Sequence, residues 1–164
     1  MLKLLYAVAC ENVIVAENGL TSLIGILERI EAQVPPDAPE TAMVAKSWQC
    51  IAFWTRGTTD FPEPVSYEQR TLIVTPKGVA VFDIQVPFIV SNSHTNYRNL
   101  GTVNGFPITQ SGILTIEVYL RKKGEEHWEK YSEYPIIVER NIAEVQNGNE
   151  DKLKRANNEV TIES

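Results

Sequence analysis

The residues best suited to acid–base chemistry lie in one polar stretch of the chain. His94 lies within the run 91–96, which otherwise consists of Ser, Asn and Thr. Because a histidine titrates near neutral pH, it can act as a general base. A hydrolase would also need a nucleophile and an orienting carboxylate, and Ser111 and Asp83 are the only partners that the sequence suggests. A surface histidine in a turn-rich loop accounts for the same pattern, so the sequence favours a protein that is not an enzyme.

Two cysteines and a second histidine complete the reactive side chains. Neither His94 nor His127 is spaced with Cys10 or Cys50 in a zinc-binding pattern. We therefore expect no metal ion and no cofactor. In a reducing compartment the two thiols would be buried as small apolar groups, whereas in an exported protein a disulfide between them remains open. The sequence does not say whether the two cysteines lie near each other.

Aromatic residues suggest a third kind of chemistry, the stacking of flat rings on a carbohydrate or another small ligand. Tyr119 and Tyr131 fall on the outward phase of two adjacent predicted strands, and Tyr97 lies in the polar stretch. A ligand site would explain the outward pair, and so would cross-strand packing of the two rings without a ligand. Trp48 and Trp54 are instead predicted to fill the core, where aromatic rings bury most area.

The charge balance argues against two classes of partner. A net charge of -6 and a pI near 5.0 oppose binding to nucleic-acid phosphates and to anionic lipid head groups. The cationic cluster 121–123 falls in a predicted turn, next to Glu125 and Glu126. No apolar run approaches the ~20 residues that cross a bilayer, and the apolar start 4–9 is too short for a secretory signal. We expect a cytoplasmic protein that binds neither nucleic acid nor membranes.

The segment 20–30, Leu-Thr-Ser-Leu-Ile-Gly-Ile-Leu-Glu-Arg-Ile, has apolar residues on both phases of a two-residue period. This pattern is typical of a strand that is covered on both faces, so we predict that it is the central strand of an all-β domain. Asn18 and Gly19 precede it and predict a tight hairpin turn with two positive φ angles. Pro35 and Pro36 end it.

Other strands are predicted at 2–15, 43–55, 66–74, 79–90, 97–103, 112–120 and 128–138. Strand 112–120 alternates most cleanly, and Pro87 places strand 79–90 at a sheet edge or at a bulge. Seven to nine short strands with regular turn signals predict an immunoglobulin-like sandwich of two antiparallel sheets. Residues 1–146 would form this domain, and the polar residues 147–164 a flexible tail.

Part of this pattern resembles a known group of proteins. The residues that carry the resemblance are Cys10-Glu11, Val13-Ile14-Val15, Gly19, Ser22-Leu23-Ile24-Gly25-Ile26, Glu28, Ile30, the prolines that follow, and Gly112 ahead of Ile116 and Val118. In these positions the chain is similar to a family of small bacterial β-sandwich domains of unknown function. The resemblance implies the fold and a bacterial source, and it supplies no catalytic residues.

Together these features favour a non-enzymatic protein-interaction or structural module. The expected partner is an unidentified protein, or a second copy of the chain joined through a sheet edge. The predicted interaction surface comprises Tyr119, Tyr131, His94 and Tyr97. Binding of a carbohydrate or small ligand through exposed aromatic rings is the alternative, and an unrecognised hydrolase is less favoured.

Overall fold

The structure is a computed structural model that describes residues 2–39, 42–57, 63–108 and 110–143. Within these residues the chain forms strands and no helix, which confirms the all-β prediction. The nine strands are β1 (Leu2–Val15), β2 (Thr21–Ile26), β3 (Arg29–Val34), β4 (Met43–Arg56), β5 (Val65–Val74), β6 (Ala80–Val90), β7 (Asn96–Pro107), β8 (Gly112–Lys122) and β9 (Glu129–Ile142). The predicted tail 147–164 lies outside the described residues.

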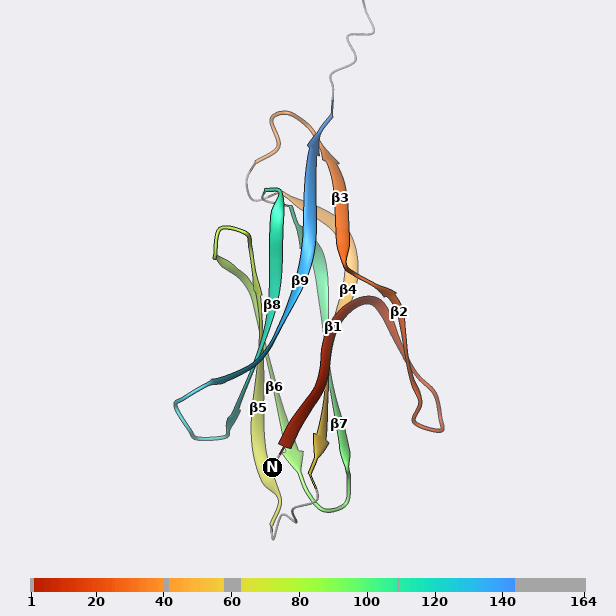
Figure 1. Ribbon diagram of the computed structural model, residues 1–164, viewed down its shortest axis with the longest axis vertical. Coiled ribbons are helices and arrows are strands. Elements are labelled where there is room, and N and C mark those ends of the chain that lie inside the picture. The colour runs from red at the N-terminus through yellow and green to blue at the C-terminus, as the bar shows by residue number, and fades with distance from the viewer. Residues whose placement is uncertain (1, 40–41, 58–62, 109, 144–164) are drawn as a thin grey trace, which may run out of the picture.

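The strands form two sheets that face each other (Figure 1). One sheet has the order β2-β1-β4-β7, and the other, which is curled, has the order β3-β9-β8-β5-β6. Every pair of neighbours is antiparallel except β3 and β9, which run parallel. The prediction of a sandwich of purely antiparallel sheets was therefore wrong for this one pair of strands.

The segment 20–30 is not a central strand. It divides into β2 and β3, which lie at the edges of different sheets. Leu27, between them, is buried, whereas Ile24 and Ile26 are 46% and 51% exposed. Gly25 makes the change of direction possible, because its φ of 62° is one that residues with a side chain rarely adopt. Apolar residues on both phases thus belong to two edge strands and not to one covered strand.

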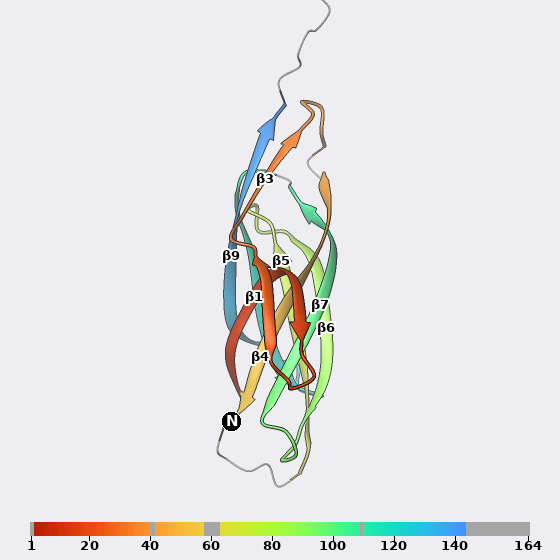
Figure 2. The ribbon, with the colours of Figure 1, turned by 90° about the vertical axis from the view of Figure 1, so that its right-hand side faces the viewer.

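The hairpin of β1 and β2 lies across the outer face of the four-stranded sheet (Figure 2). The first part of β1 pairs with β4 as far as Cys10, and the second part pairs with β2. Gln49 on β4 accepts a hydrogen bond from the Val13 amide through its side chain, at 2.7 Å. Arg98 on β7 donates a hydrogen bond to the Gly19 carbonyl at the tip of the hairpin. These two contacts hold the hairpin down over the sheet.

The tip of this hairpin differs from the predicted turn. Gly19 has a φ of 81°, but no residue other than glycine has a positive φ among those described. The Asn18 side chain instead accepts a hydrogen bond from the Leu20 amide, at 3.1 Å. Asn18 thus stabilises the turn through its side chain and not through a left-handed backbone.

The residues that fill the core between the sheets are those predicted from strands in which apolar and polar residues alternate cleanly. Trp48 and Trp54 of β4 are fully buried, as predicted, each in one of two apolar clusters. The predicted inward residues of β8 are also buried: Leu114, Ile116, Val118 and Leu120. Pro87 lies in β6 at a sheet edge, as predicted. The predicted strand 97–103 was too short, because β7 spans Asn96–Pro107 and pairs with β4 over most of its length.

One polar group joins the two sheets inside the core. Gln69 of β5 is 4% exposed, and its side-chain oxygen accepts hydrogen bonds from Trp54 Nε1 at 2.7 Å and from Asn99 Nδ2 at 2.9 Å. Its side-chain nitrogen donates to Thr71 Oγ1 at 3.1 Å. Because Trp54 and Asn99 belong to the opposite sheet, Gln69 fixes how the sheets are aligned.

Candidate interaction surfaces

The three residues considered for hydrolytic chemistry have separate partners. His94 is exposed, and its Nδ1 atom lies 2.8 Å from Ser93 Oγ. Asp83 accepts two hydrogen bonds from the Arg70 guanidinium, at 3.0 and 2.7 Å, which lowers the pKa of this carboxyl group. Ser111 Oγ accepts a hydrogen bond from the Arg140 amide, at 2.9 Å. None of these contacts brings His94, Asp83 and Ser111 together.

The two cysteines lie on adjacent strands as free, buried thiols. Cys50 lies opposite Ala9, and Cys10 lies opposite Gln49. Burial raises the pKa of the Cys50 thiol to about 12 and also raises the pKa of Cys10. Because the thiolate is the reactive form, these thiols are poor nucleophiles. Across the described residues, no group of three or more His, Cys, Asp or Glu side chains is arranged to hold a metal ion.

The two tyrosines predicted to form an outward pair lie on opposite faces of the curled sheet. Tyr119 points outward, and its hydroxyl donates to Glu117 at 2.7 Å. Tyr131 packs edge-on against the buried Trp54 ring, with centroids 5.1 Å apart. The reason is a β-bulge: Val118 pairs with Ser132 and Tyr119 with Lys130, which leaves Tyr131 as the extra residue. The outward prediction for Tyr131 was therefore wrong.

Tyr97 supports the loop that carries His94. Its ring is half-buried against Phe88, with centroids 6.0 Å apart. Its hydroxyl accepts a hydrogen bond from the Ser91 amide at 2.9 Å and lies 3.0 Å from the carbonyl oxygens of Ser91 and His94. Tyr97 thus has a structural role, and His94 is the exposed member of this part of the predicted surface.

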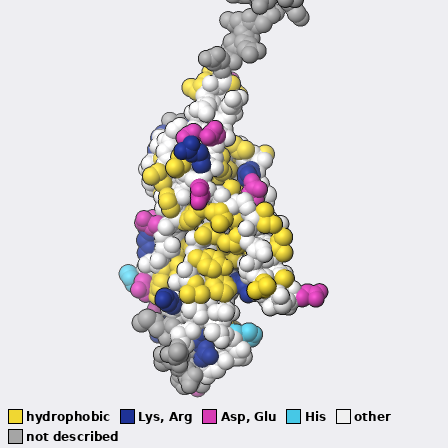
Figure 3. Space-filling model, turned by 45° about the vertical axis from the view of Figure 1, so that its right-hand side comes forward, with side chains coloured by type: hydrophobic (Ala, Val, Ile, Leu, Met, Phe, Trp, Pro, Cys, Tyr) yellow, Lys and Arg dark blue, Asp and Glu magenta, His cyan; other side chains and the backbone are white. Residues whose placement is uncertain are grey.

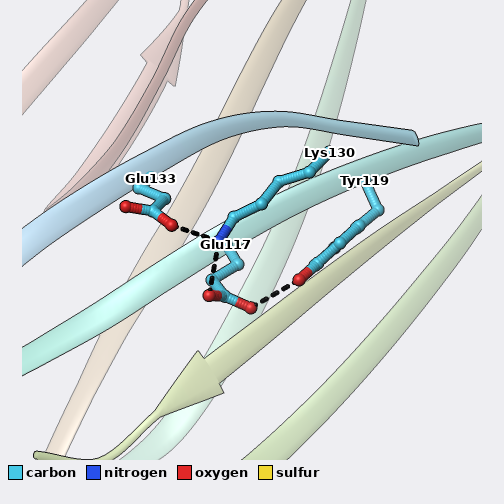
Figure 4. A network of polar contacts seen from close by, with 4 residues as sticks. All are labelled: Glu117, Tyr119, Lys130 and Glu133. Atoms are coloured by element: carbon cyan, nitrogen blue, oxygen red, sulfur yellow. Dashed lines mark hydrogen bonds and ion pairs between the residues drawn. The ribbon is translucent and has the colours of Figure 1, made fainter. Parts of the chain in front are cut away.

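The outer face of the curled sheet carries charges that are paired with one another (Figure 4). Lys130 binds both Glu117, at 2.6 Å, and Glu133. Burial alone would raise the pKa of Glu117, but hydrogen bonds from Lys130 and Tyr119 outweigh it and lower the pKa. Solvent-exposed pairs of this kind stabilise a fold by only ~0–1 kcal/mol. They leave charged side chains on this part of the face.

The same face carries a half-buried tryptophan in addition to Tyr119. Trp128 lies beneath the Arg121 guanidinium, 4.2 Å from its ring centroid, and Arg121 also binds Glu68 at 2.7 Å. The Trp128 ring therefore already has a cationic partner from its own sheet.

The hairpin on the other sheet has the opposite character. Five of its large apolar side chains are about half exposed or more: Ile14 (48%), Val15 (53%), Leu20 (66%), Ile24 (46%) and Ile26 (51%). Apolar side chains spread over the middle of the face that carries β1 and β2 (Figure 3). Because neighbouring residues of a strand point to opposite faces, Val15 lies on the other face of the hairpin from Ile14, Ile24 and Ile26. Exposed apolar side chains that share one face commonly mark an interaction site. The sequence analysis missed it, although its signal was the pattern assigned to a buried strand.

No protein-family model matches the chain, and a comparison with curated proteins gave no match. The described residues include no helix that is long and apolar enough to cross a membrane. The resemblance to small bacterial β-sandwich domains therefore stays a prediction.

Proposed function

We propose that this protein is a non-enzymatic protein-interaction module and that the exposed face of the β1–β2 hairpin is the surface that binds its partner. The observation that carries the proposal is a group of apolar side chains, about half exposed or more, on this hairpin: Ile14, Ile24 and Ile26 on one face, with Leu20 at the turn. The partner would present an apolar protein surface to them.

The energetics of this surface support the proposal. Complete burial of one such side chain is worth ~1.5–3 kcal/mol, so covering four half-exposed ones is worth ~3–6 kcal/mol before the costs of association. Backbone tethers through Gln49 and Arg98 hold the hairpin in place beforehand. A pre-organised surface loses less conformational entropy when it binds.

The remaining parts of the proposal concern the scaffold and its setting. An immunoglobulin-like relationship is supported by the facing sheets, while the parallel β3–β9 pair and the curled sheet set this chain apart. A non-enzymatic role is supported by the separate partners of His94, Asp83 and Ser111. A bacterial source and a cytoplasmic location remain predictions.

The experiment compares two double variants. The hairpin variant, Ile24→Lys with Ile26→Lys, places charge on the proposed surface. The control, Ile113→Lys with Ile137→Lys, adds the same charge to a cross-strand pair on the outer face of the curled sheet, where the two isoleucines are 56% and 42% exposed. Both variants should melt close to the wild-type temperature, because all four side chains are already in contact with water.

The partner is identified by crosslinking in lysate of the source cells, then purified and titrated against all three proteins. Sedimentation of the protein alone tests a second copy as the partner. We expect the hairpin variant to weaken binding at least tenfold and the control to bind as the wild type does. Equal binding by the two double variants would remove the hairpin as the interaction surface.

A further inference from the structure

A hollow of about 460 Å³ opens at the end of the molecule where β1 begins and where β8 turns into β9. Its apolar wall is formed by Leu2, Val65 and Leu120 together with the rings of Tyr67 and Tyr131. The volume falls within the ~300–1,000 Å³ typical of small-molecule sites. None of these residues belongs to the exposed face of the hairpin, so the hollow is separate from the proposed protein-binding surface.

Tyr67 lines this hollow and carries a hydroxyl group. The residue is only 8% exposed, and its ring stacks on Phe88 with centroids 5.9 Å apart. Among the described residues, none makes a hydrogen bond with its hydroxyl group. The hydroxyl is not one of the buried side-chain atoms that lack a partner, so it is in contact with water, and a bound acceptor can take the place of that water. Burial, and then the nearby Glu125, raise the pKa of Tyr67, so its hydroxyl remains protonated and able to donate.

Tyr131 forms the opposite aromatic wall. Its hydroxyl already donates to Glu129, at 3.0 Å, and its ring is fixed against Trp54. The hollow thus offers two positioned aromatic rings, three aliphatic side chains and one hydroxyl that is not used by the protein. Charged side chains and His127 line it from the end of β8, through the turn, to the start of β9: Arg121, Lys122, Glu125 and Glu129.

We propose that this hollow binds a flat, mainly apolar small molecule that carries a hydrogen-bond acceptor, to which the Tyr67 hydroxyl donates. A carbohydrate fits less well, because its many hydroxyl groups need several polar partners and the wall is largely aliphatic and aromatic. Binding here involves no covalent chemistry. It requires only that the ligand replace water against apolar side chains and satisfy one donor.

The test uses two probes that differ in one group: 2-naphthol, which carries an acceptor oxygen, and naphthalene, which has none. Each is titrated into the whole protein, and binding is followed by changes in the NMR signals of the Val65 and Leu120 methyl groups. Tyr67→Phe removes the hydroxyl and keeps the ring. The matched control is Tyr119→Phe, which removes a hydroxyl from the outer face of the same sheet.

We expect 2-naphthol to saturate the hollow and Tyr67→Phe to weaken its binding about fivefold, the effect of one lost hydrogen bond. Tyr119→Phe should leave the affinity unchanged, and naphthalene should bind the wild type and Tyr67→Phe equally. The thermal stability of Tyr67→Phe should not fall, because the hydroxyl has no partner to lose. The proposal is overturned if the binding of 2-naphthol does not saturate, or if the wild type and Tyr67→Phe bind 2-naphthol with equal affinity. It is also overturned if cellobiose shifts the same methyl signals and binds with higher affinity than 2-naphthol.

Discussion

Replacing Gln69 by methionine should weaken the protein far more than a change of one polar side chain usually does. Gln69→Met keeps the length of the side chain but removes the oxygen that binds Trp54 and Asn99 across the two sheets. Both donors would stay buried, since Trp54 is fully buried and Asn99 is 5% exposed. Each unsatisfied buried donor costs ~1–3 kcal/mol, and the added apolar contact returns ~1 kcal/mol.

The expected net loss in the free energy of unfolding is therefore about 1–5 kcal/mol. With a urea m-value of ~2 kcal/mol/M, the midpoint of unfolding should fall by about 0.5–2.5 M at unchanged m. Tryptophan fluorescence reports the transition, because Trp54 lies in the network itself. The same substitution at the exposed Gln85 is the control and should change stability by less than ~0.5 kcal/mol.

A double variant checks the cause. Gln69→Met with Asn99→Leu removes an acceptor and one of its donors together, so it should cost less than the sum of the two single variants. Additive losses, or a Gln69→Met midpoint within 0.3 M of wild type (about 0.6 kcal/mol at the same m-value), would show that packing and not the hydrogen bonds aligns the sheets.

Two further predictions concern the backbone and pH. Gly112→Ala should destabilise the protein by about 2 kcal/mol or more, because φ is 145° and a Cβ atom there would lie 2.9 Å from Pro76 Cβ. The control is Gly124→Ala, which should cost less in the same urea assay because no atom lies within 4 Å of its added Cβ. Equal losses of stability in the two variants would contradict the argument. Burial, with the hydrogen bond to Glu129, raises the pKa of Tyr131 from 10.0 to about 12, so its stabilising effect is complete below pH 10 and is lost as the pH rises towards 12. Tyr131→Phe should lose less stability than wild type over that interval, and parallel pH profiles would count against it.

Much of the fold was predictable where one face of a strand is buried and the other is exposed to solvent. The two-residue period of β8 gave its inward residues, because a shift by one position would expose all of Leu114, Ile116, Val118 and Leu120. The same argument placed Trp48 and Trp54 in the core. Pro87 indicated an edge because it has no amide to donate to a neighbouring strand.

The errors arose where the two-residue apolar period does not determine which face of a strand is buried. Apolar residues on both phases of 20–30 fit a strand covered on both faces, but they also fit a hairpin with one face on its own sheet and the other exposed. The bulge at Tyr131 reversed the direction of one side chain, and nothing in the local pattern marks it. Gln69 lay in the inward phase of β5, yet its partners come from β4 and β7, which the local sequence does not reveal.

The contrast between the two outer faces indicates where a partner can bind at low cost. On the curled sheet, binding would remove water from Glu117, Lys130 and Glu133, whose mutual attraction returns only part of the cost of desolvation. On the hairpin, binding covers isoleucine and leucine side chains, for which leaving water is itself favourable. The hollow at Tyr67 shares no residue with the hairpin face, and it shares Arg121 with the outer face of the curled sheet. A variant of the hairpin should therefore leave binding of 2-naphthol intact, and Tyr67→Phe should leave protein binding intact.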